Sequence, residues 1–191
     1  MMPLNKYPWS EQYGWCADQY GVNWQLMLGH ESSCKIMPHM MFVGQNAGKT
    51  EEAINFYANI FDKNKIVAIS RYEEGEPDQT GFIKYSQFEL QGLPFGAMDS
   101  SANHQFNFNE AVSFVITVDT QDEIDHYWNK LLEGGKAGKC GWIKDKYGIS
   151  WQVVPSILGK MMTNPETAPK ATYAFLQMSK FIIADLEAAV K

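Results

Sequence analysis

The sequence contains little cysteine and no long hydrophobic run. Its three cysteines, Cys16, Cys34 and Cys140, are odd in number and lack the spacing of a metal site, so free thiols in a reducing cytoplasm are expected. No apolar segment approaches the length of a membrane span, and the N-terminal residues lack the apolar core of a signal peptide. These absences predict a cytoplasmic protein without a membrane partner.

Basic residues and cofactor-binding turns are also scarce. The 191-residue chain has 16 Lys and Arg against 22 Asp and Glu, which gives a net charge of −6 at pH 7. An acidic protein repels phosphate backbones, so nucleic acid is not an expected partner. Glycine-rich strand-to-helix turns of the dinucleotide or nucleoside-cofactor type are missing, and we expect no cofactor. The hydrophobic content of 45% is typical of a globular protein with a core.

A repeated phrase is the most informative feature that is present. Residues 13–26 read YGWCADQYGVNWQL and residues 140–153 read CGWIKDKYGISWQV, with matching Gly, Trp, Asp, Tyr and Gln residues at a constant offset of 127. A full domain's length precedes the second copy, and little precedes the first. Residues 1–30 are therefore predicted to be the terminal strand pair of an incomplete module, either a remnant of a tandem protein or a docking arm.

The order of the remaining segments predicts two β-α-β-β-β units in succession. The first unit has a strand over 36–43, a helix from Thr50 to about residue 62, and strands over 65–74, 81–90 and 93–100. The second has a strand over 111–119, a helix over 120–134, a loop or degenerate strand at 134–138, and two strands within 139–155. The fold class is therefore α+β.

Caps and apolar spacing place the helices. Thr50 and Thr120 are the expected N-caps, and Thr120 with Glu123 matches a capping box. Apolar residues at helical spacing predict one C-terminal helix over 173–190. We expect a domain over 36–156 followed by a helical tail over 157–191.

Several phrases together resemble the PhnB-like branch of the vicinal oxygen chelate superfamily, often labelled 3-demethylubiquinone-9 3-methyltransferase-like. The matching phrases, which span about residues 36–190, are MFVG…EEAINFY, ISRYEEGE, FNFNEAVSF, VDTQDEIDHYWNKLLEGG, CGWIKDKYGISWQVVPSIL and FLQMSKFIIADLEAA. The resemblance implies a glyoxalase/bleomycin-resistance fold, with paired βαβββ units around a central cavity and a C-terminal helix.

The resemblance also implies where a metal would bind. Enzymes of the superfamily hold a divalent metal with four side chains on the first and last strands of each unit. The matching positions here fall at Gln152, at or near Ser113, among residues 96–98 with Asp99 just beyond, and at His39. One imidazole and one neutral amide would hold a divalent cation poorly. We therefore expect no metal, and we take the candidate ligand-binding residues to be His39, Ser113, Gln152, Met98 and Asp99.

Three functions remain open. The first is a metal-free protein that binds a small, partly apolar molecule in a sheet-lined cavity. The second is a metal-dependent lyase, isomerase or dioxygenase that uses His39, Ser113 and Gln152, with a missing donor supplied by a partner chain. The third is a structural or interaction module, in which Gln152 is a buried amide satisfied by the sheet.

A homodimer is expected, because cavities of the superfamily are commonly completed across paired units. The strand pair of residues 1–30 carries Trp9, Trp15, Trp24 and Leu26. Left uncovered, such a pair would be prone to aggregation. It is therefore expected to pack against the edge of the main domain or against a partner subunit.

Overall fold

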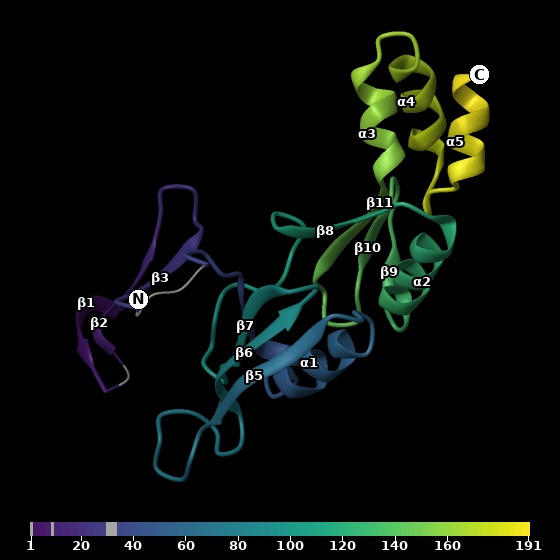
Figure 1. The fold of residues 1–191 in the computed structure, drawn as a ribbon. Coiled ribbons are helices and arrows are strands. Elements are labelled where there is room, and N and C mark those ends of the chain that lie inside the picture. Colours follow the sequence, from purple (N-terminus) through teal and green to yellow (C-terminus); the bar gives the residue numbers. More distant parts are fainter. Residues whose placement is uncertain (1, 9, 30–33) are drawn as a thin grey trace. The chain divides into compact units, whose positions relative to one another are not determined.

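The computed structural model describes residues 2–8, 10–29 and 34–191. Its contacts divide the chain into Met1–Met37 and Pro38–Lys191, called unit 1 and unit 2 below. Trp9, which we expected among the exposed aromatic residues, lies outside the described residues. Figure 1 shows the elements of both units.

Unit 1 is a small antiparallel sheet, called sheet A. It contains β1 (Met2–Tyr7), β2 (Ser10–Ala17) and β3 (Asn23–Met27), in the order β1-β2-β3. The repeated phrase forms the β2–β3 hairpin, and β1 is a strand that the sequence did not predict. The turn between β2 and β3 is held by Asp18, whose carboxylate accepts the backbone N–H groups of Tyr20 and Val22.

Unit 2 contains two βαβββ halves of identical topology, which confirms the predicted fold class. The first half comprises β4 (His39–Phe42), the 3-10 helix η1 (Gly44–Asn46), α1 (Thr50–Ala58), β5 (Asn64–Arg71), β6 (Ile83–Leu90) and β7 (Leu93–Asp99). The second comprises β8 (Ser113–Val118), α2 (Gln121–Leu132), β9 (Lys136–Ala137), β10 (Trp142–Lys144) and β11 (Ser150–Pro155). In each half the first strand lies parallel to the last, giving sheet B (β4-β7-β6-β5) and sheet C (β8-β11-β10-β9).

The two halves share one aromatic core. Helix α1 covers one face of sheet B and α2 covers one face of sheet C (Figure 1). Phe95 of β7 contacts Phe114 of β8 with ring centroids 5.2 Å apart, and Tyr57 of α1 contacts Trp151 of β11 at 5.4 Å. Because side chains alternate along a strand, the other face of each sheet lies outside this core. These two outer faces, called the open faces below, carry the candidate ligand-binding residues described next.

The C-terminal segment corrects our prediction of one helix over 173–190. It forms three helices, α3 (Ser156–Thr163), α4 (Ala168–Gln177) and α5 (Ile183–Val190). Between α4 and α5 the chain pairs with the start of the last hairpin: the N–H groups of Cys140 and Gly141 donate to the carbonyls of Met178 and Ser179, each at 2.8 Å. Phe181 is buried there. This long-range pairing competes with helical hydrogen bonds and breaks the helix.

The predicted caps have different outcomes. The capping box of Thr120 and Glu123 is confirmed, with both reciprocal hydrogen bonds present. The expectation that Thr50 caps α1 is wrong: the N-cap is Lys49, and the Thr50 hydroxyl donates to Asp99 at 2.7 Å. Among the described residues, no helix combines the length and the apolar character that a membrane span requires.

Candidate functional site

The open face of sheet C carries a polar pair that the sequence places 39 positions apart. Gln152 Nε2 donates a hydrogen bond of 2.8 Å to Ser113 Oγ. The contact arises because β11 and β8 are parallel neighbours, with Ser150 in register with Ser113. Trp151 and Val153 are buried in the core, so Gln152 between them points to the opposite face. The structure therefore brings these two candidate residues together.

Ser150 adds a third polar group to this face. It has the same strand parity as Gln152 and is buried. Its Oγ has no hydrogen-bond partner within the described part of the chain. Buried polar atoms are nearly always paired, so an orphaned hydroxyl indicates a missing partner. Exposed Val115 of β8, in register with Gln152, gives the same face an apolar surface.

His39 lies on the open face of sheet B, where its imidazole packs against Gly96. The two residues are in register on β4 and β7, and a Cβ at position 96 would lie 2.3 Å from Cδ2 of the imidazole. The ring therefore lies directly over the glycine. Burial lowers the pKa of His39 from 6.5 to about 4, so the imidazole is neutral at pH 7. Its Nδ1 is buried and has no partner among residues 2–8, 10–29 and 34–191.

Two neighbours on β6 were missed from the sequence. Gln87 is in register with Gly96, which places it on the same row as His39. The Tyr85 ring centroid lies 6.1 Å from that of His39, and its hydroxyl donates to Gln87 Oε1 at 3.3 Å. The alternation of Tyr85, Gln87 and Glu89 with buried Ser86, Phe88 and Leu90 is the signal that could have identified them.

Met98 and Asp99 lie on opposite faces of β7. Met98 is half-buried and shares the open face with His39 by strand parity. Asp99 is buried beside α1, where it accepts the N–H groups of Gly48 (2.8 Å), Thr50 (3.2 Å) and Ile83 (2.9 Å). Its carboxylate thus ties the start of α1 to β6 and is separated from the other candidates. His104, near it in sequence, contacts Ser100 Oγ at 3.0 Å instead.

The available donors do not fit a divalent metal. In the described ranges, no three His, Cys, Asp or Glu side chains come close enough to hold a metal ion. The open faces offer one imidazole, the single carboxylate of Glu89, amides and hydroxyls, whereas Zn²⁺, Mn²⁺ and Mg²⁺ are held by several imidazole, thiolate or carboxylate ligands. No step that requires a metal follows from this donor set.

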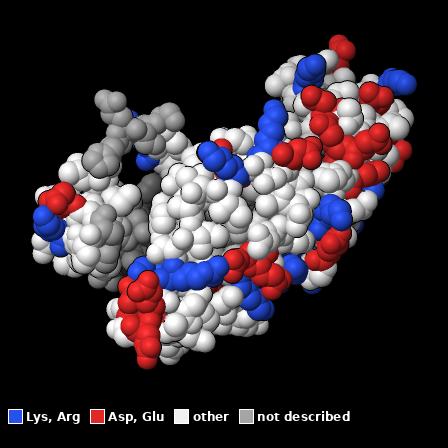
Figure 2. Space-filling view, turned by 60° about the horizontal axis from the view of Figure 1, so that its bottom comes forward, with Lys and Arg blue, Asp and Glu red and all other residues white. Residues whose placement is uncertain are grey.

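The two basic side chains of one surface hollow on unit 2 are paired with acidic side chains. A surface hollow between β5 and β6 contains Arg71 and Lys84. Arg71 pairs with Glu51 and Lys84 pairs with Glu76, each at 2.6 Å. Figure 2 shows acidic and basic side chains in adjoining groups on the face it presents. This hollow therefore lacks the uncompensated positive charge of an anion site.

Comparison with known proteins identifies the family. Residues 34–154 match the family model described as 3-demethylubiquinone-9 3-methyltransferase. The chain belongs to this family. It is 39% identical to the PhnB protein from Bacillus cereus, and the match covers 64% of this chain and 100% of that protein with a TM-score of 0.60.

A second solved structure shares the fold. Protein PA1353 from Pseudomonas aeruginosa is 21% identical over 64% of this chain and 98% of its own, with a TM-score of 0.55. No curated protein matches the sequence. The chain is thus a PhnB-like member of the vicinal oxygen chelate superfamily, as its phrases predicted. The family match begins at residue 34 and leaves sheet A outside it.

Proposed function

We propose that this protein binds a small, partly apolar molecule between open faces of sheets B and C, without a metal. The observation that carries the proposal is a pair of buried polar atoms on these faces, His39 Nδ1 and Ser150 Oγ, that have no partner among the residues the structure describes. Leaving such an atom without a partner costs about 1–3 kcal/mol. A ligand with hydrogen-bonding groups would offset that cost.

The side chains nearest the two unpartnered atoms favour an uncharged ligand, and the open face of sheet B also carries the carboxylate of Glu89, two residues along β6 from Gln87. His39 is neutral at pH 7, and Gln87, Gln152, Ser113 and Ser150 supply only neutral donors and acceptors. Lys144 pairs with Glu110, so its charge is compensated. Met98 and Val115 would contact an apolar body. Asp99 serves in this proposal as the residue that positions α1, and not as a ligand contact.

The binding cavity is proposed to form in a homodimer. Sheet B of one copy would face sheet C of the other. His39 Nδ1 and Ser150 Oγ would then form hydrogen bonds to one ligand from opposite walls of the cavity. Exposed apolar residues on unit 2, Val112, Val115 and Leu93 among them, support such an interface. Light scattering at micromolar concentration tests this: a monodisperse monomer would contradict the proposed cavity.

A thermal-shift screen of uncharged aromatic and aliphatic compounds tests binding. We expect at least one class to raise the melting temperature of the wild-type protein, and Gln152→Leu to fold normally and lose most of that shift. Gln177→Leu, which changes an exposed glutamine at the end of α4, is the matched control and should keep the shift. An equal shift in Gln152→Leu would show that the ligand binds elsewhere.

A metal-dependent lyase, isomerase or dioxygenase is the second candidate, because the unpartnered nitrogen of neutral His39 could also be a metal ligand. Elemental analysis after dialysis without chelator separates the two. We expect well under one equivalent of zinc, nickel, manganese or iron. A stoichiometric metal that is lost in His39→Gln would favour the enzyme.

A further inference from the structure

The two copies of the repeat are equivalent at the level of single hydrogen bonds. Asp18 Oδ1 accepts the N–H groups of Tyr20 (2.9 Å) and Val22 (3.0 Å), and Oδ2 accepts Trp24 Nε1 (2.9 Å). Asp145 Oδ1 accepts the N–H groups of Tyr147 (2.9 Å) and Ile149 (3.0 Å), and Oδ2 accepts Trp151 Nε1 (2.9 Å). The elements that pack on β10 and β11 therefore indicate what fits on β2 and β3.

One face of the second copy is covered by a helix. Ile143, Trp151 and Val153 are 1%, 2% and 0% exposed, and α2 packs against β10 and β11. The residues at the same offset in sheet A are Cys16, Trp24 and Leu26. Cys16 is exposed, and Trp24 and Leu26 are 41% and 54% exposed.

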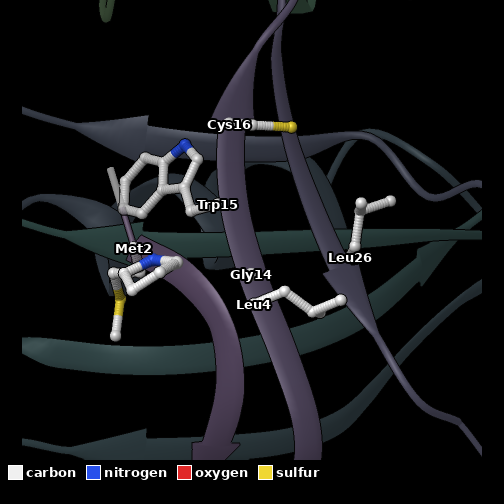
Figure 3. A pocket seen from close by; sticks show the side chains of 7 residues that line it. Met2, Leu4, Gly14, Trp15, Cys16 and Leu26 are labelled. Atoms are coloured by element: carbon white, nitrogen blue, oxygen red, sulfur yellow. The ribbon is translucent and has the colours of Figure 1, made fainter.

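The corresponding face of sheet A is hollowed. Gly14, Cys16, Leu26 and Leu4 line an apolar hollow of about 350 Å³, and Met2, in register with Trp15, borders it from the other side of β2 (Figure 3). Trp15 borders it as well, and its indole N–H is buried without a partner among the described residues. The hollow lies at the position on sheet A that corresponds to the position of α2 on sheet C.

The edge of the second copy is also occupied. Strand β11 pairs in parallel with β8 along its whole length. In the described part of unit 1, β3 pairs with β2 alone. Bonds from Leu28 N to Gln12 O and from Asp18 N to Val22 O set the alternation of the β2–β3 ladder. The N–H and C=O groups of Asn23, Gln25 and Met27 therefore point to the free edge.

We propose that sheet A is a docking site for a strand–helix segment of another polypeptide. The segment would resemble β8–α2: an apolar strand that pairs in parallel with β3, followed by an amphipathic helix that fills the hollow. Strand addition would satisfy the outward backbone groups, and burial of Leu26 and Trp24 would supply the hydrophobic contribution. Within this chain the β8–α2 segment is already engaged with β11 and the core, which is why the occupant is a separate partner.

The probe for this site is a synthetic peptide of residues 109–134, added to the full-length protein. We expect a one-to-one complex by calorimetry and slowed hydrogen exchange at the amides of residues 23, 25 and 27. Leu26→Asp should weaken binding at least about ten-fold, because a carboxylate would be buried in an apolar hollow. Met27→Pro, which removes one outward N–H and leaves the bonds to β2, should also weaken binding. Leu176→Asp changes an exposed leucine on α4 of unit 2 and should bind as the wild type does.

Three results would overturn the proposal. The first is the absence of binding, or binding that Leu26→Asp leaves unchanged. The second is peptide-induced protection confined to residues 150–155, which would mean that the peptide exchanges into sheet C. The third is protection of residues 23, 25 and 27 before peptide is added. If that protection is independent of protein concentration, unit 2 covers the site, and if it rises with concentration, a second copy does.

Discussion

The same turn occurs in unit 1 and in unit 2, but the pKa values of its two aspartates are shifted in opposite directions. Both turns follow the pattern D-x-Y-G-x-x-W, and both carboxylates accept the same two backbone N–H groups and one indole N–H. Burial raises the pKa of Asp145 above the usual 3.8. The hydrogen bond from Trp24 lowers the pKa of Asp18, which is only partly buried, below that value. The turn is therefore a local property of the pattern, whereas the acidity depends on which elements cover the turn.

Replacing each aspartate by alanine is expected to give the largest difference in stability between the two copies of the turn. Asp145→Ala would leave buried donors from Tyr147, Ile149 and Trp151 unpaired, together with the Tyr57 hydroxyl that donates to Asp145 at 2.7 Å. The free energy of unfolding of unit 2 should fall by about 4 kcal/mol, the usual cost of disrupting a buried polar network. Urea denaturation followed by near-UV circular dichroism measures this loss.

Asp18→Ala is the matched control for that experiment. Its turn is exposed, so water can replace the lost acceptor, and the unfolding midpoint of unit 2 should not move. A comparable loss of unit 2 stability in both variants would show that burial does not distinguish the copies.

His39 in unit 2 is a base whose pKa is also changed by burial, and this change should make the stability of unit 2 depend on pH. The folded protein keeps the imidazole neutral until the pH approaches about 4, whereas the unfolded chain protonates it below its usual 6.5. Its contribution to stability is therefore present above pH 6.5 and lost as the pH falls toward 4. The loss should approach about 3 kcal/mol, at about 1.4 kcal/mol per pKa unit.

Denaturation midpoints measured between those two pH values check the His39 prediction. The difference between wild type and His39→Gln isolates this residue from other titrating groups. Gln177→Leu, which changes an exposed and non-titrating residue at the end of α4, should keep the wild-type slope. If the slope survives in His39→Gln, another group is responsible for it.

The repeated glycines should respond differently to the same added methyl group. A Cβ at Gly141 would lie 2.5 Å from the Val153 carbonyl and 2.7 Å from Phe181, at a φ of +80°. At Gly14 the nearest atom, Cα of Leu4, is 3.2 Å away. Gly141→Ala should destabilise unit 2 by about 2 kcal/mol through left-handed strain and overpacking. Gly14→Ala should leave unit 2 unchanged, and equal melting temperatures for the two variants would contradict this packing.

The same distinction between local and long-range causes explains what the sequence could predict. The strand and helix order of the two βαβββ halves, and the Thr120 capping box, depend on patterns within a few residues and were confirmed. The break between α4 and α5 was missed, because the apolar spacing continues through residues 178–182. The cause is the pairing of that segment with Cys140 and Gly141, far away in sequence.

The candidate site shows this limit as well. The contact between Gln152 and Ser113 could be anticipated, because strand alternation and the parallel neighbours bring them to one face. The packing of His39 against Gly96 depends on the register between β4 and β7, which no local pattern specifies. The parity of Asp99 with buried Ala97 is visible in the strand, yet its bonds to Gly48 and Thr50 required the position of α1.

The smallest expected effect, and the most direct measure of the contrast, is the titration of the two aspartates. Carboxyl NMR should find Asp145 titrating above 3.8 and Asp18 below it. By linkage, the pH-dependent part of the stability that Asp145 contributes is largest below pH 3.8 and decreases as the pH rises through its raised pKa, while its hydrogen bonds to the turn remain. That of Asp18 is present above pH 3.8 and lost as the pH falls through its lowered pKa.

Two changes should reduce the difference between the pKa values of Asp18 and Asp145. Trp24→Phe removes the indole donor and should move the Asp18 pKa up toward 3.8, with Asp145 unaffected. Saturation with the peptide of residues 109–134 should also raise the Asp18 pKa, because a docked strand and helix would desolvate the carboxylate as the core desolvates Asp145. An Asp18 pKa that stays fixed in both experiments would mean that neither its indole bond nor its exposure sets its acidity, and that the two turns differ for another reason.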